Sequence, residues 1–106
     1  MNYQKFGFFV IPIRFNQSTN IYSDYLDFLT TIEDFGYTHL FVGEHLTDKH
    51  EDIQSSIVFA SAILARTKKL RVALSVLPLI HYDIPLLIKQ LEDLYKLSGG
   101  RLMIGF

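Results

Sequence analysis

The sequence predicts an α/β fold in which strands and helices alternate in the order β-α-β-α-β-α-β. Apolar runs typical of strands start near Phe6, Thr38, Leu70 and Arg101, at intervals of 31 or 32 residues, with helical patterns between them. Such an interval is the length of one strand-helix unit with short loops. An uninterrupted series of these units requires parallel neighbouring strands joined by right-handed crossovers.

The first unit opens on a continuous apolar run. Residues 6–11 are mainly aromatic and β-branched, as expected for a strand buried on both faces, and Pro12 ends the run. Gly36 stands where a left-handed residue would end the helix that follows. The apolar positions of this helix have the spacing of one helical face: Tyr22, Tyr25, Leu26, Leu29, Ile32 and Phe35.

The second unit combines a short strand with a longer loop. Residues 38–42 predict the strand, and the polar stretch 44–52 predicts the loop. Asp52 is expected to cap the N-terminus of a second helix, because its carboxylate accepts hydrogen bonds from free backbone N–H groups. One apolar face and a basic last turn then define this helix: Ile53, Ile57, Ala60, Ile63, Leu64, Arg66, Lys68 and Lys69.

The third unit has the clearest helix start. Residues 70–77 predict a strand that Pro78 stops. Asp83 is expected as the N-cap of the next helix, and Pro85 falls in its first turn, where a missing N–H costs nothing. The apolar face of this helix is formed by Ile84, Leu87, Ile88, Leu91, Leu94 and Tyr95. The segment Ser98-Gly99-Gly100 ends it, before a fourth strand.

Two architectures fit this pattern, an open doubly wound sheet and a (β/α)8 barrel, and both bind ligands at the carboxyl ends of their strands. A dinucleotide-binding sheet needs glycines directly after its first strand, whereas residues 12–16 are Pro-Ile-Arg-Phe-Asn. We therefore favour the barrel. Because the sequence stops within the fourth strand, at residues 101–106, we interpret residues 1–106 as the N-terminal half of a TIM (β/α)8 barrel, one partial domain.

Composition excludes several function classes. The chain has 106 residues, a net charge of −1 and no basic cluster, which argues against binding to nucleic acid or to an anionic membrane. It contains no cysteine, so a disulfide framework, a thiolate metal site and a cysteine nucleophile are all excluded. No apolar run is long enough to span a membrane, and we expect a cytoplasmic protein.

Three polar residues mark the expected carboxyl end of the sheet. His45 follows Gly43 and Glu44 after the second strand, and an imidazole that titrates near neutrality serves as proton donor or acceptor. His45 is therefore the candidate catalytic residue, although a simple polar role at a loop mouth fits the same position. Glu44 and His81, which lies after the third strand, are the candidates for substrate contact.

Other polar residues have plainer interpretations. His39, inside the second strand, is interpreted as structural. Ser75 either faces the barrel interior or a cofactor, or is a small residue tolerated in the core. Ser55, Ser56 and Ser61 lack triad partners, so they are assigned to helix surface or packing. A group of potential metal ligands has no diagnostic spacing and favours a solvated acidic loop without metal: Glu44, His45, Asp48, His50, Glu51 and Asp52.

Taken together, the order and spacing of several short segments resemble the bacterial luciferase-like monooxygenase family. The most specific are Glu44-His45 after the second strand, the junction of the second helix with the third strand, and Leu-Ser-Gly-Gly-Arg before the fourth. The segments that carry the resemblance are 6–9, 34–37, 40–45, 65–72, 77–79 and 97–102.

The resemblance implies a (β/α)8 barrel that binds reduced FMN or the deazaflavin F420 at the carboxyl ends of its strands. It implies either oxygenation of a small organic substrate by reduced flavin and O2, or hydride transfer with F420; the cofactor carries the hard step. His45 then matches the histidine near the reacting carbon. Leu74, Ser75 and Val76 match a third-strand bulge that backs the flavin ring, often through a cis peptide bond, and Gly105 borders the flavin.

The sequence also departs from the family. The loop after the third strand, residues 78–85, is longer than the usual Pro-x-x-His-Pro segment, which shifts the place of His81. A barrel that stops in its fourth strand leaves two unpaired edges and one open sheet face. We therefore expect the remainder of the barrel or a second copy of the chain as partner. The alternatives are a parent flavin enzyme, a dimerising half barrel, and a non-catalytic binding module.

Overall fold

The computed structural model describes residues 6–10, 21–44 and 54–106, and it confirms the predicted alternation of strands and helices. Short 3-10 turns extend the first unit and interrupt the connection after the third strand. In chain order the elements are β1 (Phe6–Val10), α1 (Ile21–Thr31), η1 (Ile32–Phe35), β2 (Tyr37–Val42), α2 (Ser56–Arg66), β3 (Arg71–Leu74), η2 (Leu79–His81), α3 (Ile84–Leu97) and β4 (Leu102–Ile104).

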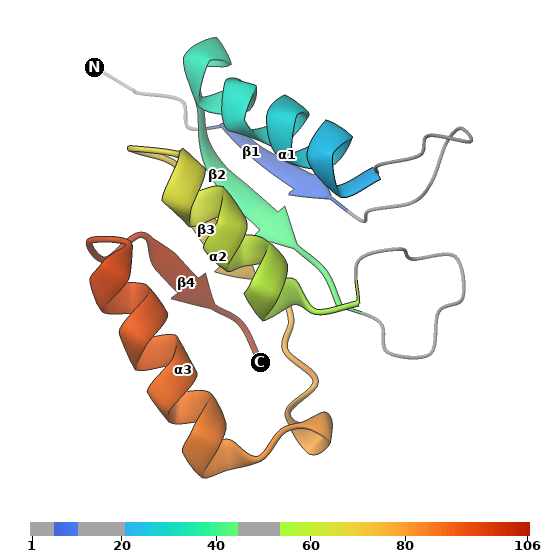
Figure 1. Ribbon diagram of the computed structural model, residues 1–106, viewed down its shortest axis with the longest axis vertical. Coiled ribbons are helices and arrows are strands. Elements are labelled where there is room, and N and C mark those ends of the chain that lie inside the picture. The colour runs from blue at the N-terminus through green and yellow to red at the C-terminus, as the bar shows by residue number, and fades with distance from the viewer. Residues whose placement is uncertain (1–5, 11–20, 45–53) are drawn as a thin grey trace.

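The four strands form one parallel sheet in the order β1-β2-β3-β4. Each strand therefore pairs with its neighbours in sequence, without the reversal of order that defines a doubly wound sheet. Figure 1 shows α1, α2 and α3 on the same side of the sheet. Sequential strands with all helices on one side are the arrangement of a barrel wall, as the sequence predicts.

The two faces of the sheet differ in burial. Towards the helices, Leu40 and Leu74 are fully buried. On the opposite face, Phe9, Phe41, Ala73 and Met103 lie in one row across the sheet. Phe9 is 54% exposed and Met103 39% exposed. The prediction that β1 is buried on both faces is therefore wrong for this chain, because none of the described residues forms a second layer.

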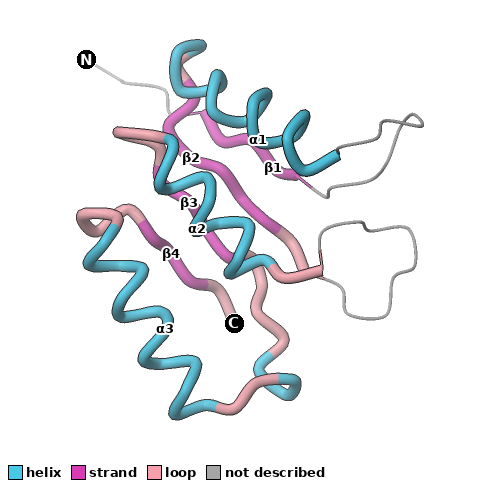
Figure 2. The backbone as a smooth tube through the Cα atoms, viewed as in Figure 1, coloured by secondary structure: helices cyan, strands magenta, loops and turns pink. Residues whose placement is uncertain are grey.

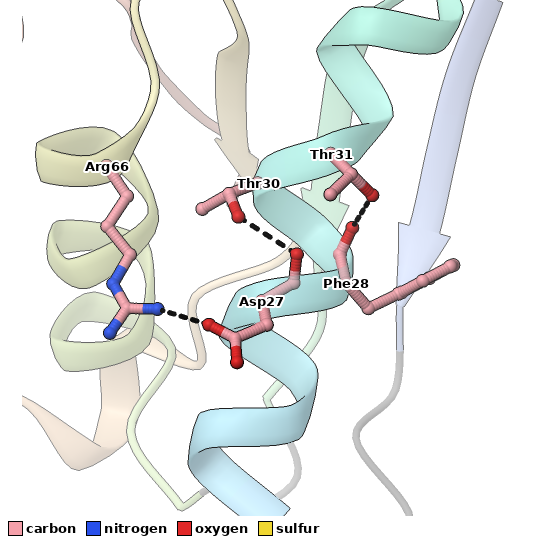
Figure 3. Close-up of polar contacts among 5 residues, drawn as sticks. All are labelled: Asp27, Phe28, Thr30, Thr31 and Arg66. Carbon is pink, nitrogen blue, oxygen red and sulfur yellow. Dashed lines mark hydrogen bonds and ion pairs between the residues drawn. The ribbon is translucent and has the colours of Figure 1, made fainter.

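The first helix ends as predicted but in a tighter turn. η1 continues α1, and Gly36 closes it in the left-handed conformation with φ 90°. Figure 3 shows how α1 is fixed on its outer side: Arg66 of α2 donates to the Asp27 carboxylate at 3.1 Å. Thr30 Oγ1 donates to the Asp27 carbonyl at 2.9 Å in the same view, and Thr31 Oγ1 bonds to the carbonyl of Phe28.

The second helix begins later than predicted. Ser55, in extended conformation, caps it by accepting a hydrogen bond from Val58 N, so the prediction of Asp52 as N-cap is wrong. Asp52 itself lies outside the described residues. The helix also ends at Arg66, which places Lys68 and Lys69 beyond its last turn. Both errors arise because serine and aspartate have similar cap propensities, and charge alone does not fix a helix end.

Strands β3 and β4 are shorter than predicted, and α3 matches the prediction. After Leu74 the chain leaves the ladder: Ser75 N still donates to the Val42 carbonyl, but Leu77 N donates to that of Gly105. The Asp83 side chain caps α3 by accepting from Leu86 N at 3.0 Å, which confirms the predicted start.

Arg101 joins three elements at the amino-terminal end of the sheet. Its guanidinium donates to the carbonyl of Leu64 (2.8 Å), to that of Leu70 (3.2 Å) and to Thr67 Oγ1 (2.9 Å). It also donates to the Ser98 carbonyl at 2.7 Å. The planar guanidinium thus ties the end of α2, the start of β3 and the end of α3 together.

Glu33 performs a similar task from η1. Its carboxylate accepts the backbone N–H groups of Lys68, Lys69 and Leu70 at 3.0–3.3 Å. Burial raises the pKa of Glu33, but these N–H groups and the nearby Arg101 guanidinium outweigh burial and lower the pKa below its ordinary value of 4.5. The amino-terminal end of the sheet is therefore held by one anion and one cation.

Candidate functional site at the carboxyl end of the sheet

The candidate site lies where the strands point, opposite the end held by Glu33 and Arg101. Figure 2 shows that the connections following β2 and β3 and the residues after β4 all leave the sheet at this end. Three segments can be described there: Gly43 and Glu44 after β2, residues 75–83 after β3, and Gly105 and Phe106 after β4.

The segment that follows β3 has an unusual backbone. The peptide bond between Ser75 and Val76 is cis, which confirms the cis peptide expected in this segment. Leu74 is fully buried towards the helices, Ser75 is half-buried, and Val76 is 52% exposed. Val76 therefore presents an apolar side chain at the carboxyl end of the sheet.

Gly105 packs directly against this segment. Its N–H donates to the Leu74 carbonyl at 2.8 Å, and its carbonyl accepts from Leu77 N at 2.9 Å. A Cβ at this position would lie 3.3 Å from Val76 Cγ1 and 3.4 Å from the Leu74 carbonyl oxygen. The structure thus brings the four predicted cofactor-binding residues, 74–76 and 105, into one continuous patch.

Glu44 is bonded within the protein through both carboxylate oxygens. Its Oε1 atom accepts a hydrogen bond from the backbone N–H of Ser56, the first residue of α2, at 3.0 Å. Its Oε2 atom accepts from the hydroxyl of Tyr82. These contacts link the end of β2 to α2 and to the β3–α3 connection. The predicted contact of Glu44 with substrate stays a prediction.

The environment of Tyr82 favours its neutral phenol. Burial is the largest cause that raises the pKa of Tyr82 above its ordinary value of 10.0, and the hydrogen bond and negative charge of Glu44 raise it further. Ser56 acts weakly in the opposite direction. The phenol therefore remains a hydrogen-bond donor to Glu44 through neutral and moderately alkaline pH.

Comparison with known proteins places this geometry in a family. The sequence model described as "Luciferase-like monooxygenase" matches residues 5–106. The chain belongs to the luciferase-like monooxygenase family. One curated luciferase-like relative is 4-hydroxyprotoasukamycin monooxygenase of Streptomyces nodosus subsp. asukaensis, 27% identical over 103 residues. The match covers 94% of this chain and 28% of that protein.

Solved structures show the same fold. The oxygenating constituent of 3,6-diketocamphane monooxygenase from Pseudomonas putida, in complex with FMN, superimposes with a TM-score of 0.85 at 17% identity. An F420-dependent secondary alcohol dehydrogenase with an F420-acetone adduct gives 0.72 at 20% identity. The chain is covered to 95% and 94% in these matches but spans only 28% and 30% of the two structures. It thus forms a fragment of the TIM-barrel fold of the luciferase-like family.

Of the four histidines of this luciferase-like chain, two lie within the described residues. His45, the predicted catalytic residue, and His50 lie outside the described residues. His81 is exposed in η2, at the carboxyl end of the sheet as predicted. His39 bonds through Nδ1 with Thr38 Oγ1 at 2.7 Å and stacks on Phe41 with ring centroids 6.3 Å apart, which confirms its structural interpretation.

No group of three or more potential metal ligands occurs among residues 6–10, 21–44 and 54–106. Most of the acidic loop that contains potential metal ligands, residues 45–52, lies outside these ranges.

Over the same described part of the chain, the helices are too short or too polar to cross a membrane. One cavity of about 240 Å³ opens between α1 and α2, lined by Tyr22, Leu26, Gln54, Ser55, Val58, Phe59 and Ala62.

Glu44, Ser56 and Tyr82 form a hydrogen-bonded cluster at the carboxyl end of the sheet, and the sequence alone did not predict Ser56 and Tyr82 as members of this cluster. Tyr82 was assigned only to a loop, and Ser56 only to helix surface or packing. Ser56 is 2% exposed, and its hydroxyl has no hydrogen-bond partner among the described residues. Neither residue stands in a recognisable motif, because their contact with Glu44 joins positions 12 and 38 residues apart. Only the tertiary fold brings them together.

Proposed function

We propose that the chain is part of a flavin-dependent oxidoreductase, a monooxygenase that uses reduced FMN and O2 on a small organic substrate. The observation that carries this proposal is the patch formed by residues 74–76 and Gly105 at the carboxyl end of a parallel sheet, in a chain that belongs to the luciferase-like family. Bound reduced flavin would supply the electrons that activate oxygen.

The residues of the chain would hold and orient the cofactor. Val76 would contact one face of the flavin ring, while Leu74 and Ser75 would fix the backbone beneath it. Gly105 would leave room for the ring edge because it has no side chain. His45 would donate or accept the proton at the reacting centre, and His81 would contact the substrate. These roles are proposals, and the chain spans about a third or less of the length of the relatives that it matches.

The second candidate is hydride transfer to or from coenzyme F420. The similarity to an F420-dependent secondary alcohol dehydrogenase favours it, although at a lower TM-score than the FMN complex. A third candidate is a non-catalytic half barrel that covers its open face with a second copy. The exposed row that includes Phe9 and Met103 favours this candidate.

Titration of the chain with FMN, with reduced FMN under anaerobic conditions and with F420, followed by fluorescence, tests the three candidates. Saturable binding of reduced FMN supports the monooxygenase, and binding of F420 alone supports hydride transfer. Absence of binding by all three would contradict both enzymes. In a chain that binds, His45→Ala should leave affinity nearly unchanged and lower turnover, and unchanged turnover would remove His45 from the mechanism.

A further inference from the structure

One side chain joins the two ends of the β2–α2 connection to the β3–α3 connection at the carboxyl end of the sheet. Glu44 follows β2, Ser56 begins α2, and Tyr82 follows η2 on the way to α3. The two oxygens of the Glu44 carboxylate are divided between them, Oε1 for Ser56 N at 3.0 Å and Oε2 for the Tyr82 hydroxyl. The same carboxylate therefore fixes the end of one strand against a helix start and against a second loop.

The two hydrogen bonds that the Glu44 carboxylate accepts are charge-assisted. Hydrogen bonds to an ionised carboxylate are shorter and stronger than bonds between neutral groups. A negative charge at the N-terminus of α2 is also favourable, because the helix exposes free N–H groups there. Tyr82 keeps its proton because burial and Glu44 both raise its pKa, so the donor is present across the physiological range.

Ser56 adds a second polar group to the cluster. Ser56 is 2% exposed, and its hydroxyl forms no hydrogen bond of good geometry within the described part of the chain. It nevertheless lies near enough to the Tyr82 phenol to lower the pKa of that phenol slightly.

The residues next to the cluster are candidate functional residues. Glu44 directly precedes His45 in the chain, and Tyr82 directly follows His81. We propose that Glu44 and Tyr82 are positioning residues of the cofactor end: their hydrogen bond holds the beginning of the loop after β2 against the β3–α3 connection. This inference rests on the proposed function only in that the carboxyl end is where flavin binds.

Two variants break this bond while leaving the packing in place. In Glu44→Gln the amide oxygen can still accept from Ser56 N, but the amide NH2 is a donor, so the Tyr82 O–H loses its carboxylate acceptor. Tyr82→Phe removes the donor and keeps the ring. Glu33→Gln is the matched control, because it weakens a carboxylate that accepts backbone N–H groups at the opposite end of the sheet.

Tyrosine absorbance during alkaline titration tests the bond itself. We expect one tyrosine of the wild-type chain to lose its proton later than the others. This late step should move towards ordinary tyrosine pH values in Glu44→Gln, disappear in Tyr82→Phe and persist in Glu33→Gln. A wild-type chain without a late step, or a late step that survives in Tyr82→Phe, would overturn the proposal. Far-UV circular dichroism verifies that each variant is folded, and Tyr82→Phe serves if Glu44→Gln does not fold.

The imidazole NMR signals of His45 and His81 test positioning in the flavin-free chain. Both signals should shift by more than a linewidth in Glu44→Gln and in Tyr82→Phe, and the double variant should shift them no further. Glu33→Gln should leave them in place. If the late tyrosine step vanishes but neither imidazole signal moves, Glu44 and Tyr82 do not position these loops.

Flavin affinity separates this inference from the proposed function. In a chain that binds reduced FMN, Glu44→Gln and Tyr82→Phe should each weaken binding about tenfold, which corresponds to about 1.4 kcal/mol, and Glu33→Gln should not. Unchanged affinity in both variants would overturn the positioning role. If the wild-type chain binds no flavin, the proposed function fails, while the tyrosine and imidazole measurements still decide whether Glu44 and Tyr82 position the loops.

Discussion

The two ends of the sheet use charged side chains in different ways. At the amino-terminal end, Glu33 and Arg101 are bonded almost entirely to the backbone and bring three connections together. At the carboxyl end, Glu44 bonds to a tyrosine hydroxyl and to the backbone N–H of Ser56, and Val76 exposes an apolar side chain. The first end is built for stability. The second has the apolar exposure expected of a binding site.

The largest loss of stability is expected for Arg101→Lys, which tests the structural role of the amino-terminal end. A lysine cannot reproduce the forked contacts with the Leu64 and Leu70 carbonyls and Thr67, so we expect about 3 kcal/mol less stability in urea unfolding. Affinity for reduced FMN should change little in the folded variant. Arg71→Lys is the control, because Arg71 is exposed and its replacement should change stability by no more than about 0.5 kcal/mol. Equal stability of both variants would contradict a structural role for Arg101.

A substitution at Gly105 should, in contrast, lower the affinity for flavin. In Gly105→Val the new side chain meets Val76 and the Leu74 carbonyl, and overpacking of this kind destabilises by about 1–3 kcal/mol. The flavin affinity should fall by about tenfold or more, a loss of at least about 1.4 kcal/mol. Gly36→Ala, at the other end of the sheet, strains a residue with φ 90° and should lower stability alone. Unchanged flavin affinity in Gly105→Val would remove Gly105 from the site.

The pH dependence of stability should report the amino-terminal end. Because the pKa of Glu33 is lower in the folded chain than in the unfolded chain, its contribution is full above about pH 4.5 and is lost as the pH falls through the lower folded pKa. Urea midpoints measured from pH 7 to pH 3 should therefore fall less steeply for Glu33→Gln than for the wild type. Parallel curves for the two proteins would show that Glu33 is not anchored in this way.

The smallest effect is expected at the helix surface. The ion pair of Asp27 and Arg66 joins α1 to α2, but the two side chains are 72% and 44% exposed. Exposed pairs contribute about 0.2–1 kcal/mol, and salt screens them. Asp27→Asn should thus shift the unfolding midpoint slightly at low ionic strength and hardly at all in 1 M salt. A large, salt-independent loss would show that α1 depends on this pair more than its exposure indicates.

Much of the fold follows from local patterns. The spacing of apolar residues predicted the strands and α-helices of the described residues but not η1 and η2, and Gly36 and Asp83 marked two boundaries correctly. The errors fall where neighbouring residues have equal propensity, as with Asp52 and Ser55, or where tertiary bonds end a strand, as after Leu74. Local propensity cannot predict such hydrogen bonds, because their partners lie in other elements.

The candidate site was only partly predictable. Residues 74–76 and Gly105 were named through the family resemblance, and the structure places them side by side. The role of Arg101 was not visible, because an arginine in a Ser-Gly-Gly-Arg turn gives no sign that its donors meet carbonyls about thirty residues away. The role of Tyr82 could not be predicted for the same reason, since a single loop tyrosine belongs to no periodic pattern from which its partner could be inferred.

The contact between Gly7 and Phe41 has a consequence for how the sheet is assembled. The Phe41 ring occupies the space above Gly7, where any Cβ would lie 2.6 Å from ring atom Cε2. A shift of β1 by one residue along β2 would replace Gly7 with Phe6 or Phe8 beneath that ring, and the Phe41 side chain would then have to move. The missing side chain at Gly7 thus favours the observed register of β1 over a shift by one residue.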